Sequence, residues 1–252
     1  MSRISDKLSK LHKTSAPMGF GFVARQSPER RMLLMASFVA APTEESVPGL
    51  ADVADCVVLR GVQLPKGINS TALPAGCWMA GDEALPEGIS NESCDFVISA
   101  VDGPASILSV EGLGWIPVLE QGAEASYLRA VAEVGAEAVL VSGDSIDLTL
   151  LSTFVELRRM RLLSGRPLFL SVDAPIDAGT LVALSRAGVE GLIVAAEGGL
   201  DTLKQLAETL VSTASRMGKS RKDEAVAVVG HVVGTSVDEE LEEEGEEEED
   251  DE

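Results

Sequence analysis

The stretch EVGAEAVLVSG, residues 133–143, contains the pattern from which the fold can be inferred. A helix-like segment ends at Gly135, an acid follows at Glu137, and an uninterrupted apolar run then begins. The same outline returns in RAGVEGLIVAA at 186–196 and in LADVADCVVLRG at 50–61. A continuous apolar run bounded by a turn is typical of a parallel strand that is covered on both faces. The repeat therefore predicts helix–turn–strand units around a buried parallel sheet.

Eight such apolar runs follow one another along the chain. They cover residues 32–38, 55–60, 76–80, 95–100, 116–120, 137–142, 167–173 and 190–196. In the second half they alternate with amphipathic helical segments at 123–134, 147–163, 177–187 and 200–217. Alternating strands and helices form βαβ units with right-handed crossovers, and eight units in about 200 residues are typical of a closed barrel. The predicted fold class is α/β, a (β/α)8 TIM barrel.

The crossovers in the first half are predicted to be short. VQLPKGINSTALPA (62–75) and DEALPEGISNES (82–93) contain Pro and Gly where a full helix would lie. A doubly wound open sheet is the alternative fold. It normally carries a Gly-rich turn after its first strand, and SFVAAPTEES (37–46) is not one. We therefore prefer the barrel with short N-terminal crossover helices.

Segments outside the repeat set the expected domain boundaries. Residues 1–17 form an N-terminal helix or arm, in which Ile4, Leu8 and Leu11 share one face that would close the barrel floor. The barrel covers 18–218, and its first part, MGFGFVARQ at 18–26, is either a strand or an added hairpin arm.

The C-terminal part divides into two further segments. Residues 219–237 are expected to form a hinge with an added strand or helix at 225–234, AVAVVGHVVG. The last segment, 238–252, holds thirteen acids in fifteen residues. Such a run repels itself and has almost nothing to bury, so we expect a disordered acidic tail. The tail is expected to contact basic proteins or to mimic an anionic ligand; the alternative is an appendage that only keeps the protein in solution.

Net charge, the length of the apolar runs and the cysteine spacing argue against several classes of protein. Removing the tail's thirteen acids from the formal net charge of −21 leaves −8, which argues against nucleic-acid binding. The longest apolar run has ten residues, too short for a membrane span, and no secretory signal is recognisable. Cys56, Cys77 and Cys94 lack zinc-ligand spacing. Reduced, buried cysteines are typical of a cytoplasmic protein, which is the location we expect.

Barrels of this kind keep their chemistry where the strands end, so residues there are the candidate site. Side chains alternate along a strand, which places Glu120 on one face with Val118 and places Ser171 with Asp173. We predict Glu120 and Asp173 as catalytic acid and base in a dry barrel mouth, with Arg60 as a clamp for an anionic substrate. Further candidates at strand ends are Ser37, Asp82, Glu83, Ser99, Asp102, Gln121, Ser142, Asp144, Ser171 and Glu197.

Two alternatives remain for these acids. Glu120, Asp144 and Asp173 would bind a divalent cation such as Mg²⁺ through oxygen ligands. Alternatively, Glu120 and Arg60 satisfy each other and only close the top of the core. Acids at the strand beginnings lie at the opposite end of the barrel, where they are expected to support stability; they are Asp55, Asp95, Glu137 and Glu190.

The absence of histidine and lysine from the predicted strands disfavours several classes of enzyme. The two histidines, His12 and His231, lie outside the eight predicted strands, and no lysine falls in any of them. This disfavours a Schiff-base aldolase, a His-ligated metallohydrolase and a Ser–His–Asp triad. An enzyme on this chain would be of lyase or isomerase type.

The segment AGVEGLIVAAEGGLDTL, residues 187–203, resembles the last βα unit of the phosphate-binding TIM barrels. The resemblance implies that Gly198 and Gly199 present backbone N–H groups to a phosphate at a helix N-terminus. Glu197 and the glycine-poor DAPIDAG (173–179) depart from that pattern. The predicted function is that of an enzyme or binding protein for a small anionic, phosphorylated metabolite, with Arg60, Ser142, Ser171, Gly198 and Gly199 binding it. The alternative is a non-catalytic barrel that serves as a scaffold, with its tail as the contact element.

Overall fold

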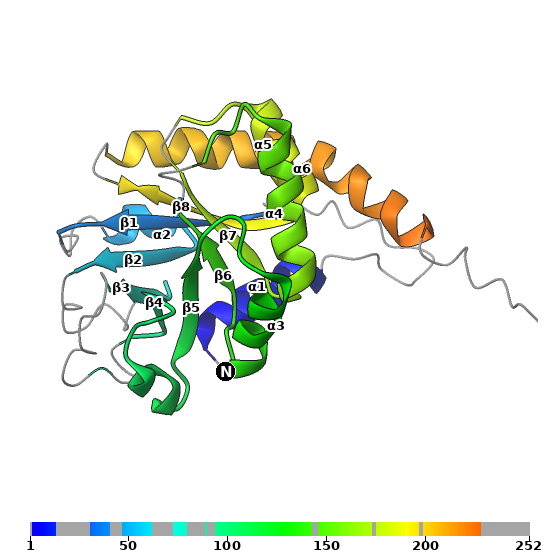
Figure 1. Ribbon diagram of the computed structural model, residues 1–252. Coiled ribbons are helices and arrows are strands. Elements are labelled where there is room, and N and C mark those ends of the chain that lie inside the picture. Colours follow the sequence, from blue (N-terminus) through cyan, green and yellow to red (C-terminus); the bar gives the residue numbers. More distant parts are fainter. Residues whose placement is uncertain are drawn as a thin grey trace, which may run out of the picture.

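The computed structural model describes residues 2–13, 31–40, 47–61, 73–79, 89, 94–142, 146–172, 175–196 and 199–227. All eight predicted strands form, and they close into one parallel barrel in which each strand pairs with the next and β8 pairs with β1 (Figure 1). Closure excludes the doubly wound alternative. The strands are β1 Leu33–Phe38, β2 Cys56–Arg60, β3 Ala75–Trp78, β4 Phe96–Ala100, β5 Gly114–Leu119, β6 Val139–Val141, β7 Leu168–Val172 and β8 Val189–Ala195.

Helices cover the outside of the barrel unevenly. The second half carries full helices, α3 to α6, that pack against one another in chain order. In the first half, α2, between β1 and β2, and the 3-10 helix η2, between β4 and β5, have five residues each. The two crossovers that Pro and Gly predicted to be short, 62–75 and 82–93, lie largely outside the described residues. The helices are α1 Arg3–Lys13, α2 Val47–Ala51, η2 Ala105–Ser109, α3 Ala125–Val134, α4 Leu151–Ser164, α5 Ala178–Ala187 and α6 Leu200–Ala227.

Each strand buries both of its faces, which explains its continuous apolar run. One face packs inside the barrel, in a cluster that includes Met35, Val58, Phe96 and Phe169. The other face packs under the helices, in a larger cluster that includes Trp115. The strand face on which a residue lies therefore decides whether it points into the barrel or under the helices.

Helix α1 closes the floor of the barrel, as expected from its apolar face. Ile4 and Leu8 are buried and belong to the inner cluster. The acid at the start of β4 helps to hold this end: Oδ2 of Asp95 accepts a hydrogen bond from the backbone N–H of Ala75 at 2.8 Å and lies 3.5 Å from Nη1 of Arg3.

The other strand-start acids are also engaged in structural contacts. Oδ2 of Asp55 accepts the backbone N–H of Leu34 at 2.9 Å, and Oε2 of Glu137 accepts the hydroxyl of Ser2. Glu190, which is 2% exposed, accepts two hydrogen bonds from Arg161 of α4, at 2.9 and 3.1 Å. The acids at this end of the barrel are thus paired or hydrogen-bonded, as expected of residues that support the fold.

The C-terminal helix is longer than predicted. We expected it to end at 217, but α6 continues to Ala227 and so takes up the first residues of the predicted apolar segment 225–234. The segment 18–26 and residues 228–252 lie outside the described residues. Within the described part of the chain, no helix is long and apolar enough to cross a membrane.

Candidate functional site

Arg60 lies at the mouth of the barrel, in contact with side chains from three other strands. Arg60 ends β2, and its Nε donates a hydrogen bond to Oγ of Ser37 at 2.8 Å. Its Nη2 lies 3.4 Å from Oγ of Ser171, and its guanidinium carbon stands 4.1 Å from the ring centre of Trp78. Side chains from β1, β3 and β7 thus contact the guanidinium that β2 carries.

Strand alternation brings these four side chains together. Ser37 and Ser171 lie two residues beyond Met35 and Phe169, which point into the barrel, so both serines also face inward. Arg60 and Trp78 are register partners on β2 and β3, and Trp78 packs against the inner cluster. The four residues form the uppermost layer of the barrel interior. Arg60 and Ser171 therefore both point into the barrel.

The charge of Arg60 is not neutralised by its described partners. Both serine hydroxyls are uncharged, and a guanidinium stacked on an indole face keeps its charge. Ion pairs within the described part of the chain join Arg3 to Asp95, Glu156 to Arg159, Glu190 to Arg161 and Asp201 to Lys204, and none of these involves Arg60. A planar cation held by neutral groups is suited to binding a carboxylate or a phosphate.

Glu120 is not in the dry environment that the sequence suggested. It follows the last residue of β5 and is exposed to solvent, so the dry environment expected of a catalytic acid is not there. Within the described residues no ion pair joins Glu120 to Arg60, so mutual neutralisation of these two groups is not what closes the core. Its assignment as a catalytic residue stays a prediction.

The remaining candidates have different surroundings. Ser142 follows β6 directly and is half-buried. The N–H of Gly199 donates to the carbonyl of Ala196 at 3.0 Å, and its φ of 92° is one that glycine adopts without strain. Ser99 lies on the outer face of β4, where it accepts a hydrogen bond from Nε1 of Trp115 at 3.1 Å, so it is not part of the mouth. Six candidates lie outside the described residues: Asp82, Glu83, Asp144, Asp173, Glu197 and Gly198.

The predicted metal ligands fall largely outside the described residues. Among the residues that the structure describes, no group of three His, Cys, Asp or Glu side chains is placed to hold a metal ion. Two of the three expected ligands, Asp144 and Asp173, lie beyond that part of the chain. A divalent cation at the mouth therefore stays a prediction.

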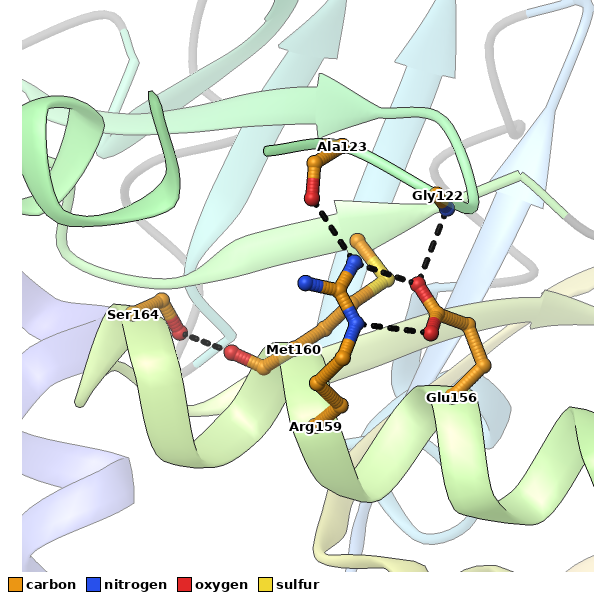
Figure 2. Close-up of polar contacts among 6 residues, drawn as sticks. All are labelled: Gly122, Ala123, Glu156, Arg159, Met160 and Ser164. Atoms are coloured by element: carbon orange, nitrogen blue, oxygen red, sulfur yellow. Dashed lines mark hydrogen bonds and ion pairs between the residues drawn. The ribbon is translucent and has the colours of Figure 1, made fainter. Parts of the chain in front are cut away.

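An ion pair on α4 fixes the loop that follows β5, and the sequence did not point to it. Oε1 of Glu156 accepts the N–H of Gly122 at 2.8 Å, and Nη2 of Arg159 donates to the carbonyl of Ala123 at 2.7 Å (Figure 2). Glu156 and Arg159 also bind each other at 2.7 Å, which lowers the pKa of Glu156. The pair positions the loop that begins at Glu120. Its only sequence signal was an ordinary Glu–Arg spacing of three on a helix.

Comparison with known proteins supports the fold and no narrower assignment. No family model matches the chain, and no curated protein matches it in sequence. Among solved structures it is similar to the tryptophan synthase alpha chain of Legionella pneumophila subsp. pneumophila, with 15% identity, a TM-score of 0.57, and coverage of 86% of this chain and 99% of that one.

Two further solved structures give the same result. The tryptophan synthase A-subunit from the hyperthermophile Pyrococcus furiosus has 12% identity and a TM-score of 0.52, with 72% of this chain and 96% of that chain covered. A designed, cube-shaped protein cage has 16% identity and a TM-score of 0.56, with 79% of each chain covered. At these identities the likeness concerns the fold alone: the chain is an α/β protein with a closed, eight-stranded TIM barrel.

Proposed function

We propose that this protein binds a small anionic metabolite at the mouth of its barrel, with Arg60 as the anion clamp. One observation carries the proposal: the guanidinium is fixed by Ser37, Ser171 and Trp78, and none of these groups neutralises it. A cation held in place before the ligand arrives loses little conformational entropy on binding. The mouth is also where barrels of this fold place their ligands.

The ligand class follows from the donors. A guanidinium binds the paired oxygens of a carboxylate or a phosphate, and the hydroxyls of Ser37 and Ser171 lie beside it. Ser142, Gly198 and Gly199 would add donors around a phosphorylated ligand. If the protein is an enzyme, Glu120 and Asp173 would serve as acid and base, or as Mg²⁺ ligands together with Asp144.

The two tryptophans permit a direct binding test. Trp78 stacks on Arg60, whereas Trp115 is buried under the helices and bound to Ser99, so only Trp78 reports on the mouth. Titration with inorganic phosphate and with small phosphomonoesters and dicarboxylates, at constant ionic strength, is expected to change the tryptophan fluorescence. At a ligand concentration of 100 Kd the protein should gain about 2.7 kcal/mol of stability.

Matched variants separate binding at the mouth from general electrostatics. Arg60→Met should abolish both the fluorescence change and the stabilisation by ligand. Trp78→Phe should abolish the fluorescence change, while stabilisation by ligand, measured as a rise in the thermal unfolding temperature, should persist. Arg129→Met, which removes an exposed arginine from α3, should bind like the wild type. If no anion binds the wild type, or if Arg60→Met binds equally well, the proposal is wrong and the non-catalytic alternative gains support.

We further propose a reducing, cytoplasmic location. The support is that Cys56, Cys77 and Cys94 are all buried and free, a pattern typical of reducing compartments. Burial also raises the pKa of the Cys56 thiol, which disfavours its reactive thiolate.

A further inference from the structure

Helix α4 exposes apolar side chains where a barrel helix normally presents polar ones. Leu151 is 78% exposed, and Val155 and Leu162 are each 63% exposed. Their spacing of four and seven residues places them along one side of the helix. Leu150, just before the helix, is 51% exposed. An apolar stripe of this length on an outer helix indicates a contact surface.

The stripe borders a groove between α4 and α5. The groove has a volume of about 500 Å³, and its apolar lining includes Leu151, Phe154, Val155 and Ala183. Two arginines, Arg158 of α4 and Arg186 of α5, also line it. We call this feature the α4–α5 groove. It calls for an occupant that is apolar and negatively charged.

The chain itself contains such an occupant. Beyond α6 lie residues 228–252, with five valines at 228–237 followed by the thirteen acids of 238–252. We propose that this C-terminal segment docks in the α4–α5 groove, with its valines against the apolar lining and its carboxylates at Arg158 and Arg186.

Reach and charge both favour this occupant. Helix α6 packs against α5, so the segment starts from a neighbouring helix (Figure 1). A chain of 25 residues spans up to about 80 Å, several times the length of α4. Because the segment is tethered, its effective concentration at the groove is in the millimolar range, so weak contacts suffice.

Other occupants fit less well. A second copy docking through the same groove would bring its own Arg158 and Arg186 against the first pair, and a basic protein would be repelled by both. Surface contacts between arginines and carboxylates are weakened by salt, so docking should depend strongly on ionic strength. A basic protein that captures the acidic tail would then uncover the apolar lining of the α4–α5 groove.

Paramagnetic relaxation enhancement on the full-length chain tests the proposal. A nitroxide is attached at Ser236→Cys, while the native cysteines are buried and stay unlabelled. At 20 mM NaCl the amide signals of Leu151 and Val155 should lose more than half of their intensity, and those of α3 should not. Raising NaCl to 0.5 M, or introducing Arg186→Glu alone or with Arg158→Glu, should restore the intensity.

A charge-reversal variant on α3 and the salt series serve as controls for this experiment. Arg129→Glu places the same charge reversal on α3, outside the groove lining, and should leave the broadening unchanged. The salt series is measured with native Arg158 and Arg186, so it tests docking even if an arginine variant folds poorly. Uniform intensities along α4 would overturn the proposal. Broadening that appears only between a labelled chain and a separate isotope-enriched chain would also overturn it and would assign the groove to a second copy.

Discussion

Two glycines make room for the two phenylalanines inside the barrel. A Cβ on Gly76 would stand 2.2 Å from the ring of Phe96, its register partner, and a Cβ on Gly191 would stand 2.5 Å from the ring of Phe169. Both rings are fully buried, so neither can move aside at low cost. Pairs of large and small residues on adjacent strands thus fill the interior.

We expect Gly76→Ala and Gly191→Ala to lower the free energy of unfolding by about 1–3 kcal/mol each, because both overpack a closed core. Urea unfolding measures the loss. Gly49→Ala is the control, since its Cβ would meet only Leu200 at an ordinary 3.5 Å. Phe96→Leu should recover part of the loss in the Gly76→Ala background. Equal stability of all three alanine variants would contradict this account of the interior.

Two aspartates should give opposite dependences of stability on pH. Burial raises the pKa of Asp95, so its contribution to stability is full below the unfolded pKa and is lost as pH rises through the folded pKa. The pKa of Asp177 is lowered by hydrogen bonds from Thr180 and Gly179, so its contribution is lost as pH falls. Relative to wild type, Asp95→Asn should therefore gain stability as pH rises from about 3 to about 6, and Asp177→Asn should lose it. Urea midpoints across this range check both signs, and parallel slopes would refute the assignment.

At the scale of elements, a leucine of α1 and a leucine of α4 differ sharply in their exposure to solvent. Leu8 of α1 is 4% exposed and packs into the floor of the barrel, whereas Leu162 of α4 is 63% exposed. Both helices are short and carry leucines among charged residues, so composition alone does not separate them. Only the packing of the helix determines how much each leucine contributes.

Leu8→Ala should therefore destabilise the protein by about 2–5 kcal/mol, since it removes buried methyl groups and leaves a cavity. Leu162→Ala should stay within about 0.5 kcal/mol of wild type, because it removes little buried surface. Thermal and urea unfolding of the two variants compare the same chemical change in two environments. A large loss for Leu162→Ala would indicate that Leu162, which lies outside the lining of the α4–α5 groove, is also covered in the folded chain.

At the scale of the whole molecule, the paired acids and the proposed anion site lie at opposite ends of the barrel. At the strand beginnings, acids are paired or bound to backbone, as Glu190 is to Arg161. At the strand ends, the described groups leave the charge of Arg60 without a partner of opposite sign. Parallel strands place all their beginnings at one end, so one set of residues can maintain the fold while another remains available to a ligand.

Substitutions at the two ends should accordingly have different effects. Arg161→Met removes the two hydrogen bonds that Arg161 donates to the buried Glu190 and should cost up to about 3 kcal/mol of stability, less than for a fully buried pair because Arg161 is 24% exposed. Adding Glu190→Leu should recover most of that loss. Neither variant should change the Kd for an anion, whereas Arg60→Met should abolish anion binding with a smaller effect on unfolding. Coupled losses of binding and stability at both ends would argue against the separation.

Local sequence was enough to assign the strands, their number and the closed barrel, because burial on both faces is visible in each run of residues. It also indicated that the strand-start acids lie away from the mouth and that Ser171 shares a strand face with Asp173, since strand alternation has a fixed period. Which of these side chains meet depended on the folded chain. Arg60 and Ser171 lie 111 residues apart in the sequence, and their contact requires the closure and register of the barrel. Local patterns carry no such distances, so the exposure of Glu120, the stacking of Trp78 and the hold of Glu156 and Arg159 on the loop after β5 emerged only from the tertiary structure.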